Sequence, residues 1–127
     1  MKSRYWMLVQ EREDIEYTVG TMTNIKYKND TFDMVYTCEA LEHAVDIESA
    51  IRELARVTKS DGTIVVIDKN KDKLGCMEID AWEQWFDMYE LKNLMLKYCS
   101  KVEIIDEINY EGKASDGLFC AWIGKVK

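Results

Sequence analysis

The strongest constraint on the fold is a strand, helix, strand pattern in the middle of the chain. Residues 32–37 (FDMVYT) are rich in aromatic and branched side chains, which is typical of a β-strand. Residues 63–68 (TIVVID) form a nearly continuous apolar run, which is typical of a strand that is covered on both faces and has parallel neighbours. The pattern predicts a right-handed βαβ unit over residues 32–68.

The segment between these two strands is predicted to be a helix. Asp46 can cap its amino terminus and Glu48 lies in the first turn, where a carboxylate is stabilising. The helix is expected to run to about Thr58 and to end at the turn Lys59-Ser60-Asp61-Gly62. Its apolar face consists of Ile47, Ala50, Ile51, Leu54 and Ala55.

Further elements are predicted on both sides of this unit. Residues 15–19 (IEYTV) alternate like a short strand that stops at Gly20. Residues 102–108 and 118–126 are predicted to be strands, and the join NYEGKASDG suits an antiparallel hairpin. The fold class is therefore α/β with a mixed sheet.

Residues 77–98 are predicted to be helical with a restart. Asp80 could cap a short helix that carries Trp82, Trp85 and Phe86, and Asp87 could cap a second one. The second helix would carry Leu91, Leu94, Met95 and Tyr98. Since the chain has no proline and only six scattered glycines, residues 1–127 are expected to form a single domain without a linker.

Composition excludes several function classes. A net charge of −7 repels phosphate backbones and anionic lipids, so neither nucleic-acid nor membrane partners are expected. The apolar runs are too short to span a bilayer and the first residues are too charged for a signal peptide, so we expect a cytoplasmic protein. Widely spaced cysteines predict reduced thiols and no metal site; they are Cys38, Cys76, Cys99 and Cys120.

The first strand of the βαβ unit runs into a polar segment, residues 37–43 (TCEALEH), which we call the elbow. Ligands of open α/β sheets bind outside the carboxyl ends of the strands, and the elbow lies at such a position. Glu39, Glu42 and His43 follow at spacings that place them on one side of a helical turn. His43, the only histidine, is a candidate general base that Glu42 or Glu39 would orient; alternatively it packs at the start of a helix.

The run from Phe32 to Asp68 resembles the second half of the class I, type-11-like S-adenosylmethionine-dependent methyltransferases. Members of this family commonly read FDxV, then LEH, then E-x-x-R-V-L-K-P-G-G, then an apolar strand. The matching residues are Phe32, Asp33, Val35, Leu41, Glu42, His43, Glu53, Arg56, Val57, Lys59 and Gly62. The resemblance implies a Rossmann-like methyltransferase fold, S-adenosylmethionine as cofactor and a small-molecule acceptor.

The resemblance also implies which residues contact the cofactor. Gly20, Thr21 and Met22 stand where the family has an acidic Gly-Asp-Ala turn, so they are expected near the adenine, although without the usual carboxylate. Thr37, Cys38 and Glu39 would lie along the methionine side. By the same resemblance, His43 with Glu42 would face the acceptor.

The family's glycine-rich loop is missing from this sequence, in which no two glycines lie within two residues of each other. Only glycines let the backbone approach the cofactor closely. The fold is therefore expected to be truncated by a βαβ unit on the order of 30 residues. In the family's sheet order, 3-2-1-4-5-7-6, this loss leaves residues 32–37 at a bare edge, so we expect residues 15–19 or 4–10 to pair there, or a homodimer or strand-swapped assembly.

Three interpretations stay open beside these. Glu39, Glu42 and His43 resemble the E-x-x-E-H arrangement that binds a divalent cation in some quinone O-methyltransferases, or they form a solvated helix face. The aromatic residues Trp82, Trp85 and Phe86 form either a lid over the acceptor or part of the core. The whole chain is either a methyltransferase or part of one, or it is a cofactor-free remnant that binds a partner. Under both interpretations, Glu53 and Arg56 are expected to form a structural ion pair.

Overall fold

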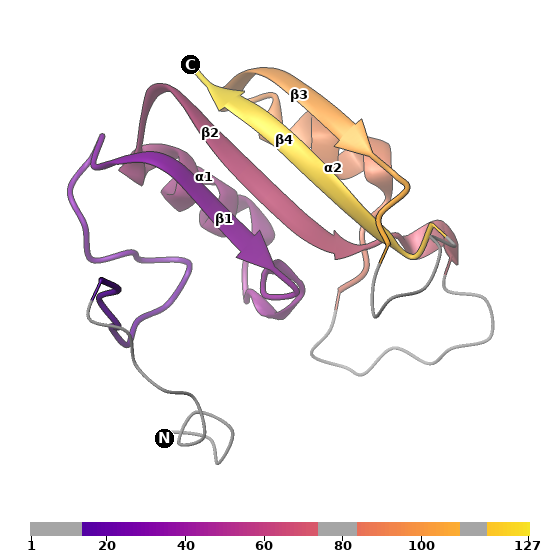
Figure 1. The fold of residues 1–127 in the computed structure, drawn as a ribbon, viewed down its shortest axis with the longest axis horizontal. Coiled ribbons are helices and arrows are strands. Elements are labelled where there is room, and N and C mark those ends of the chain that lie inside the picture. The colour runs from indigo at the N-terminus through magenta and orange to yellow at the C-terminus, as the bar shows by residue number, and fades with distance from the viewer. Residues whose placement is uncertain (1–13, 74–83, 110–116) are drawn as a thin grey trace.

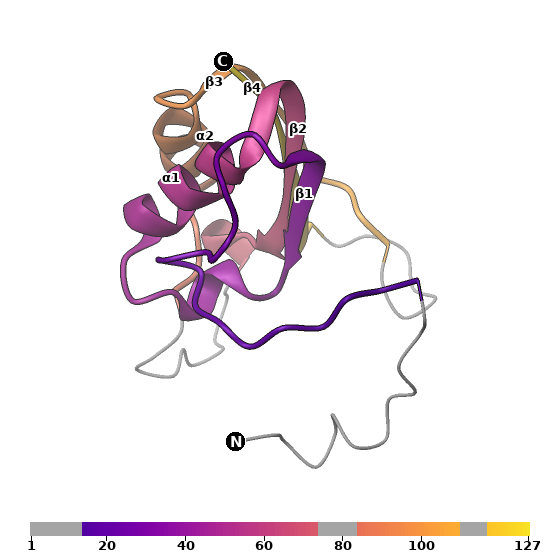
Figure 2. The ribbon, with the colours of Figure 1, turned by 90° about the vertical axis from the view of Figure 1, so that its left-hand side faces the viewer.

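The computed structural model describes residues 14–73, 84–109 and 117–127, in which a four-stranded mixed sheet carries two α-helices on one face (Figures 1 and 2). The strand order is β1-β2-β4-β3. The elements are β1 (Phe32–Cys38), η2 (Leu41–His43), α1 (Ile47–Val57), β2 (Thr58–Lys69), η3 (Lys71–Lys73), α2 (Met88–Met95), β3 (Cys99–Ile105) and β4 (Phe119–Val126). Within the described ranges, no helix has the length and apolar character needed to cross a membrane.

The predicted βαβ unit is confirmed. β1 and β2 are parallel, with Met34 opposite Thr63 and Cys38 opposite Ile67. The Asp46 carboxylate accepts a hydrogen bond from the Ser49 N–H at 3.2 Å, so it caps α1 as expected. The order β1-β2-β4-β3 corresponds to the 4-5-7-6 part of the order that the resemblance implies.

β2 begins at Thr58, directly after α1, and not at Thr63 as predicted. Phe32 pairs with Thr58 and Met34 with Thr63, so residues 59–62 form a bulge that β1 does not match. Gly62 is required there because a Cβ atom would lie 2.7 Å from the Lys59 carbonyl oxygen and 2.8 Å from that of Asp33. The predicted turn is therefore a bulge within the strand.

The carboxyl-terminal hairpin is also confirmed. β3 and β4 are antiparallel, with Val102 opposite Gly124, and β4 is antiparallel to β2 on its other side. β3 begins three residues before the predicted position because Cys99 already pairs with Val126. Residues 110–116 of the predicted turn lie outside the described residues.

The predicted strand at residues 15–19 is wrong, because these residues belong to none of the strands in the described part of the chain and Val19 is 96% exposed. The chain after them is bound to α1 instead of β1. Arg56 donates to the carbonyls of Ile25 and Tyr27 at 2.7 and 2.8 Å, and it pairs with Glu53 at 2.6 Å. This confirms the structural ion pair, and Arg56 also holds the chain along the helix. Residues 4–10, the other segment expected to pair with β1, lie outside the described part of the chain.

The second predicted helix of the 77–98 segment is confirmed as α2, capped by Asp87, whose carboxylate accepts from the N–H groups of Tyr89 and Glu90 at 3.0 Å. The first predicted helix of this segment is wrong for residues 84–86, the part of it that the structure describes. Phe86 forms a parallel bridge with Asn70, which requires an extended backbone. Residues 77–83 lie outside the described residues.

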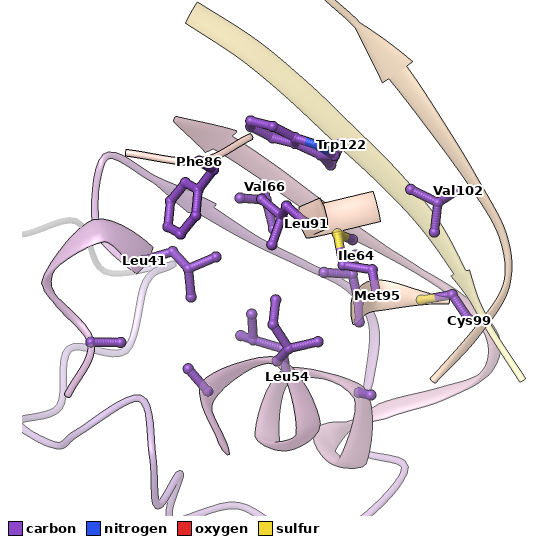
Figure 3. Packing of buried hydrophobic residues seen from close by; sticks show 14 of the residues in the cluster. Leu41, Leu54, Ile64, Val66, Phe86, Leu91, Met95, Cys99, Val102 and Trp122 are labelled. Atoms are coloured by element: carbon purple, nitrogen blue, oxygen red, sulfur yellow. The ribbon is translucent and has the colours of Figure 1, made fainter. Parts of the chain in front are cut away.

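The core lies between the sheet and the two helices (Figure 3). Trp122 is fully buried, stacks edge-on against Phe86 at a centroid distance of 6.3 Å, and donates its indole N–H to the Met88 carbonyl at 2.9 Å. Leu41 belongs to the same core and is fully buried. Because Leu41 opens η2, the core holds the elbow against the end of the sheet.

Candidate functional site

The elbow leaves the sheet through Glu39, which has a φ of 50°. This left-handed conformation is uncommon for a residue with a side chain and turns the chain sharply away from β1. The Glu39 N–H still donates to the Ile67 carbonyl at 2.9 Å, and the Leu41 side chain is buried two residues later. The polar side chains of the elbow are therefore held at the carboxyl ends of the two parallel strands, where ligands of α/β sheets bind.

Lys69, the last residue of β2, joins two carboxylates of the elbow. Its Nζ lies 3.1 and 3.0 Å from the two oxygens of Glu42 and 3.2 Å from Oε1 of Glu39, and 5.6 Å from the centre of the Trp85 ring. The Glu42 side chain is only 3% exposed. Burial lowers the pKa of Lys69, but the hydrogen bonds to Glu42 and Glu39 outweigh it and leave the pKa above its usual value, so Lys69 is charged.

Asp68 is a second buried carboxyl group at this end of the sheet. It is fully buried and accepts hydrogen bonds from the N–H groups of Lys69 at 2.9 Å and Glu42 at 3.3 Å. Burial, and then the charge of Glu42, raise the pKa of Asp68 to about 7. Asp68 can therefore exchange a proton near neutral pH.

His43 lies at the outer end of the elbow, with 47% of its side chain exposed. Its Nε2 atom is 3.4 Å from Oε1 of Glu42. Of the two carboxylates expected to orient the imidazole, Glu42 is thus in contact with it, while Glu39 contacts Lys69. Glu42 is shared between an imidazole that faces solvent and an ammonium group that is mostly buried.

Thr37 and Cys38 are the first two residues of the elbow and the last two residues of β1. Thr37 is buried, and among the described residues its hydroxyl has no hydrogen-bond partner. Cys38 is exposed, and burial of the sulfur with the charges of Glu39 and Asp68 raises the pKa of its thiol. Cys38 is therefore a thiol at neutral pH and is not set up as a nucleophile.

The expected adenine contacts lie in a different place. Gly20, Thr21 and Met22 contribute to a groove of about 440 Å³ that is lined entirely by residues 16–27: Glu16, Thr18, Val19, Gly20, Thr21, Met22, Ile25, Lys26 and Tyr27. No elbow residue lines this groove. The described residues thus contain both sets of expected cofactor contacts, and this groove is lined by the first set alone.

The elbow carboxylates already surround a cation. Lys69 places its ammonium group within 3.2 Å of oxygens from both Glu39 and Glu42. In the described part of the chain, no three His, Cys, Asp or Glu side chains are arranged to hold a metal ion. The geometry therefore gives Glu39 and Glu42 a lysine as their partner in place of the divalent cation considered from the sequence.

Residues 84–86 pack against the elbow. Gln84 donates its backbone N–H to the Glu42 carbonyl at 3.0 Å and its side-chain amide to the Ala44 carbonyl at 3.1 Å. Phe86 is 8% exposed and belongs to the core, so the lid interpretation is wrong for this residue. Trp85 lies near Lys69 at the rim of the site, and Trp82 lies outside the described residues.

The contacts of Lys69 with Glu39 and Glu42 were not predicted from the sequence. β2 ends with Asp68 and Lys69 at the same edge of the sheet as the elbow, but sequence spacing alone does not say where a side chain points. The parallel register, with Cys38 opposite Ile67, brings Lys69 beside the elbow.

The comparisons with known proteins agree with this fold. A family model described as a methyltransferase domain matches residues 1–66, just over half of the chain. The chain belongs to the class I S-adenosylmethionine-dependent methyltransferases. It is 42% identical over 55 residues to norajmaline N-methyltransferase from Rauvolfia serpentina, a match that covers 43% of this chain and 19% of that enzyme. It is 30% identical over 112 residues to sterol 24-C-methyltransferase from Aspergillus fumigatus, which covers 85% of this chain and 26% of that one.

Solved methyltransferases share the fold. A structure of a S-adenosylmethionine-dependent methyltransferase from Thermotoga maritima matches with a TM-score of 0.72 at 19% identity, over 85% of this chain and 62% of that chain. The YcgJ protein from Bacillus subtilis matches with a TM-score of 0.64 at 18% identity, over 91% and 72%. The matched stretches span about a fifth to a quarter of the length of the curated relatives named above.

Proposed function

We propose that this chain forms the acceptor side of a methyl-transfer site that acts on a small molecule. The observation that carries the proposal is the contact between His43 and Glu42 at the carboxyl ends of β1 and β2. S-adenosylmethionine would supply an electrophilic methyl group for direct displacement, so the protein's task is mainly to position the acceptor and remove a proton.

His43 is the proposed general base for an acceptor hydroxyl. Its imidazole is half exposed and therefore accessible to a bound molecule, and the Glu42 carboxylate at 3.4 Å favours an orientation in which one ring nitrogen is directed outward. Lys69 holds Glu42 in place through both carboxylate oxygens. Lys69 is thus a positioning residue for the pair.

The cofactor side of the proposal uses two segments. Gly20, Thr21 and Met22 would lie near the adenine, and Thr37, Cys38 and Glu39 would lie along the methionine part. Since this sequence contains no glycine-rich loop, we propose that the loop comes from additional polypeptide and that these 127 residues do not bind the cofactor tightly alone.

A cofactor-free binding domain is the second candidate function. The observation in its favour is the separation of the groove at residues 16–27 from the elbow. Under both candidates we propose a second copy of the chain as a partner and a cytoplasmic location, the latter supported by the free thiols of Cys38, Cys99 and Cys120.

The test is methyl transfer by a chimera in which the amino-terminal strand and glycine-rich loop of a family member precede this chain. Transfer from radiolabelled S-adenosylmethionine to a panel of phenols, quinols and amines is expected for the chimera. His43→Ala should lower the rate about 100-fold or more, as expected for loss of a general base. Lys97→Ala is the matched control, because Lys97 pairs with Glu48 on an exposed surface.

A folded chimera that transfers no methyl group would favour the binding domain. Full activity of His43→Ala would remove His43 from the proposed mechanism while leaving methyl transfer intact. Circular dichroism of each variant distinguishes loss of function from loss of fold.

A further inference from the structure

Asp68 is an ionisable residue on the core-facing side of β2. Buried side chains alternate along this strand, so Ile64, Val66 and Asp68 lie on the same face of the sheet. Ile64 and Val66 belong to the hydrophobic core, and Asp68 is buried as completely as they are although it carries a carboxyl group. Burial of such a group is costly unless its oxygens are hydrogen-bonded, so the contacts of Asp68 indicate its role.

The two oxygens of Asp68 bind two different segments of the chain. Oδ1 accepts the Lys69 N–H at 2.9 Å, and Oδ2 accepts the Glu42 N–H at 3.3 Å. The side chains of the same two residues, Lys69 and Glu42, contact each other at 3.0 Å. One buried carboxyl group thus holds the backbone of both members of an ion pair that are 27 residues apart in the sequence.

The contact with Glu42 supplies a cap to η2. The residue before this short helix is Ala40, which makes no side-chain capping hydrogen bond. The internal hydrogen bonds of η2 begin with the His43 N–H, which donates to the Ala40 carbonyl at 3.1 Å. The Glu42 N–H precedes them and donates to Asp68, which therefore acts as the side-chain oxygen of a capping residue would.

Glu42 is consequently held at three points. Asp68 accepts its N–H, the Gln84 N–H donates to its carbonyl at 3.0 Å, and Lys69 binds both oxygens of its carboxylate. From this fixed position Oε1 of Glu42 contacts Nε2 of His43 at 3.4 Å. In a neutral imidazole one ring nitrogen carries the proton and the other accepts one. A carboxylate beside Nε2 favours the proton there, so Nδ1 is left as the accepting nitrogen.

We propose that Asp68 is a positioning residue for the His43–Glu42 pair: it accepts the Glu42 N–H, fixes the Glu42 carboxylate beside β2, and thereby sets the direction of the His43 imidazole. Its consequence for methyl transfer rests on the proposed function of His43 as a base. The alternative is that Asp68 contributes only to the stability of the fold. The two roles differ in a folded variant, because only a positioning residue releases the imidazole when its contact is lost.

The test is NMR spectroscopy of the 127-residue chain, in which His43 is the only histidine. At about pH 8, above the pKa of about 7 to which burial raises Asp68, the carboxyl group is ionised. We expect the couplings between the Hα and Hβ protons of His43 to show one χ1 rotamer in the wild type. In Asp68→Val they should average over several rotamers, and the Glu42 N–H should exchange with water about tenfold faster, as expected for the loss of one hydrogen bond.

Two further variants separate positioning from stability. Glu42→Gln should also release the imidazole, and its combination with Asp68→Val should release it no further, because both changes act through the same carboxylate. Asp46→Ala is the matched control, since it removes another carboxylate cap, that of α1. It should lower the stability of the protein while His43 keeps its rotamer.

Asp68→Asn offers one carbonyl oxygen to the two N–H groups, and it replaces Asp68→Val if valine prevents folding. A single His43 rotamer in the folded variant, or averaged rotamers in the wild type, would overturn the proposal. Averaging in Asp46→Ala as extensive as in the Asp68 variant would also overturn it, because loss of stability alone would then explain the effect. Full methyl transfer by the His43→Ala chimera would instead disprove the proposed base and would leave these NMR results unchanged.

Discussion

At the scale of single residues, the elbow depends on charged groups that are hidden from solvent. Glu42 and Asp68 are almost completely buried, and one ammonium group, that of Lys69, contacts Glu42 directly. Buried charges are costly unless they are paired, and removing one partner usually costs about 3–5 kcal/mol. Stability is expected to depend differently on the two carboxyl groups. Glu42 contacts the ammonium group of Lys69, whereas Asp68 accepts hydrogen bonds from backbone N–H groups.

Asp68 should make the protein less stable as the pH rises. Its pKa is about 7 in the folded chain, well above the ordinary value of 3.8, so between these values the folded chain binds a proton that the unfolded chain releases. The contribution of Asp68 to the free energy of unfolding is therefore largest below about pH 4 and falls by up to about 4 kcal/mol by pH 7.

Asp68→Asn should remove this dependence. Urea unfolding from about pH 4 to pH 8 should show that the stability of the variant relative to wild type increases with pH across this window. Asp61→Asn, at an exposed carboxyl group, is the control and should follow the wild type. A constant difference between Asp68→Asn and wild type at all pH values would mean that Asp68 is ionised throughout.

Lys69→Met should be strongly destabilising. The change leaves Glu42 buried without a cation, and we expect a loss of about 3 kcal/mol in the free energy of unfolding at neutral pH. Lys59→Met is the control, because Lys59 pairs with Asp33 on the surface and should cost less than about 1 kcal/mol. Adding Glu42→Gln to Lys69→Met should recover stability; no recovery would show that Lys69 acts through packing on Trp85 instead.

At the scale of elements, the return from α1 to β2 depends on a close backbone approach. The chain passes from Val57 directly into β2. Residues 59–62 bulge out of β2, because only one residue of β1 lies between the pairs Phe32–Thr58 and Met34–Thr63. The contacts that a side chain at Gly62 would meet include two backbone carbonyls. Backbone atoms cannot move aside cheaply, so the bulge depends on this glycine.

Gly62→Ala should destabilise the protein by about 2 kcal/mol or more, in the range known for overpacked sites. Gly20→Ala is the matched control, because no atom lies within 4 Å of the Cβ position and the substitution should be neutral or slightly stabilising. Thermal unfolding measures both. A Gly62→Ala variant as stable as Gly20→Ala would show that the bulge adjusts freely.

Local sequence patterns correctly predicted the helices and strands whose apolar periodicity matches the face that they bury. The predictions failed where contacts with distant residues determine the backbone conformation. The apolar run of β2, the Asp46 cap of α1 and the hairpin of β3 and β4 are all present, although β2 and β3 begin earlier than predicted. Residues 15–19 alternate like a strand but belong to none of the described strands, and the hydrogen bonds of Arg56 hold the following segment along α1. The aromatic residues before α2 follow a helical spacing, yet the bridge from Phe86 to Asn70 holds their end extended.

The candidate site was predictable to a similar degree. The predicted strand end placed Glu39, Glu42 and His43 at the carboxyl end of β1, because strand ends are visible in the sequence. The helical turn expected from their spacing includes only Glu42 and His43, because η2 begins at Leu41 and Glu39 is left-handed. The network among them was not predictable, since it depends on Lys69 arriving from another strand and on the left-handed turn at Glu39. These features arise from the register between β1 and β2.

At the scale of the whole molecule, the described residues form one layer of helices on one face of a sheet (Figure 2). Polar groups gather at the carboxyl ends of its parallel strands. This is the fold of the methyltransferase family over most of the chain, and it covers 62% of the Thermotoga maritima structure. The family's glycine-rich loop is the part that this sequence does not contain. We therefore expect tight binding of the cofactor to need that loop in addition to these residues.

Calorimetric titration of S-adenosylmethionine into the 127-residue chain, and in parallel into the folded chimera that carries a glycine-rich loop, tests this claim most directly. We predict saturable binding in the micromolar range for the chimera and no saturation at millimolar ligand for the chain alone. Saturable, one-to-one micromolar binding by the chain alone would contradict the account.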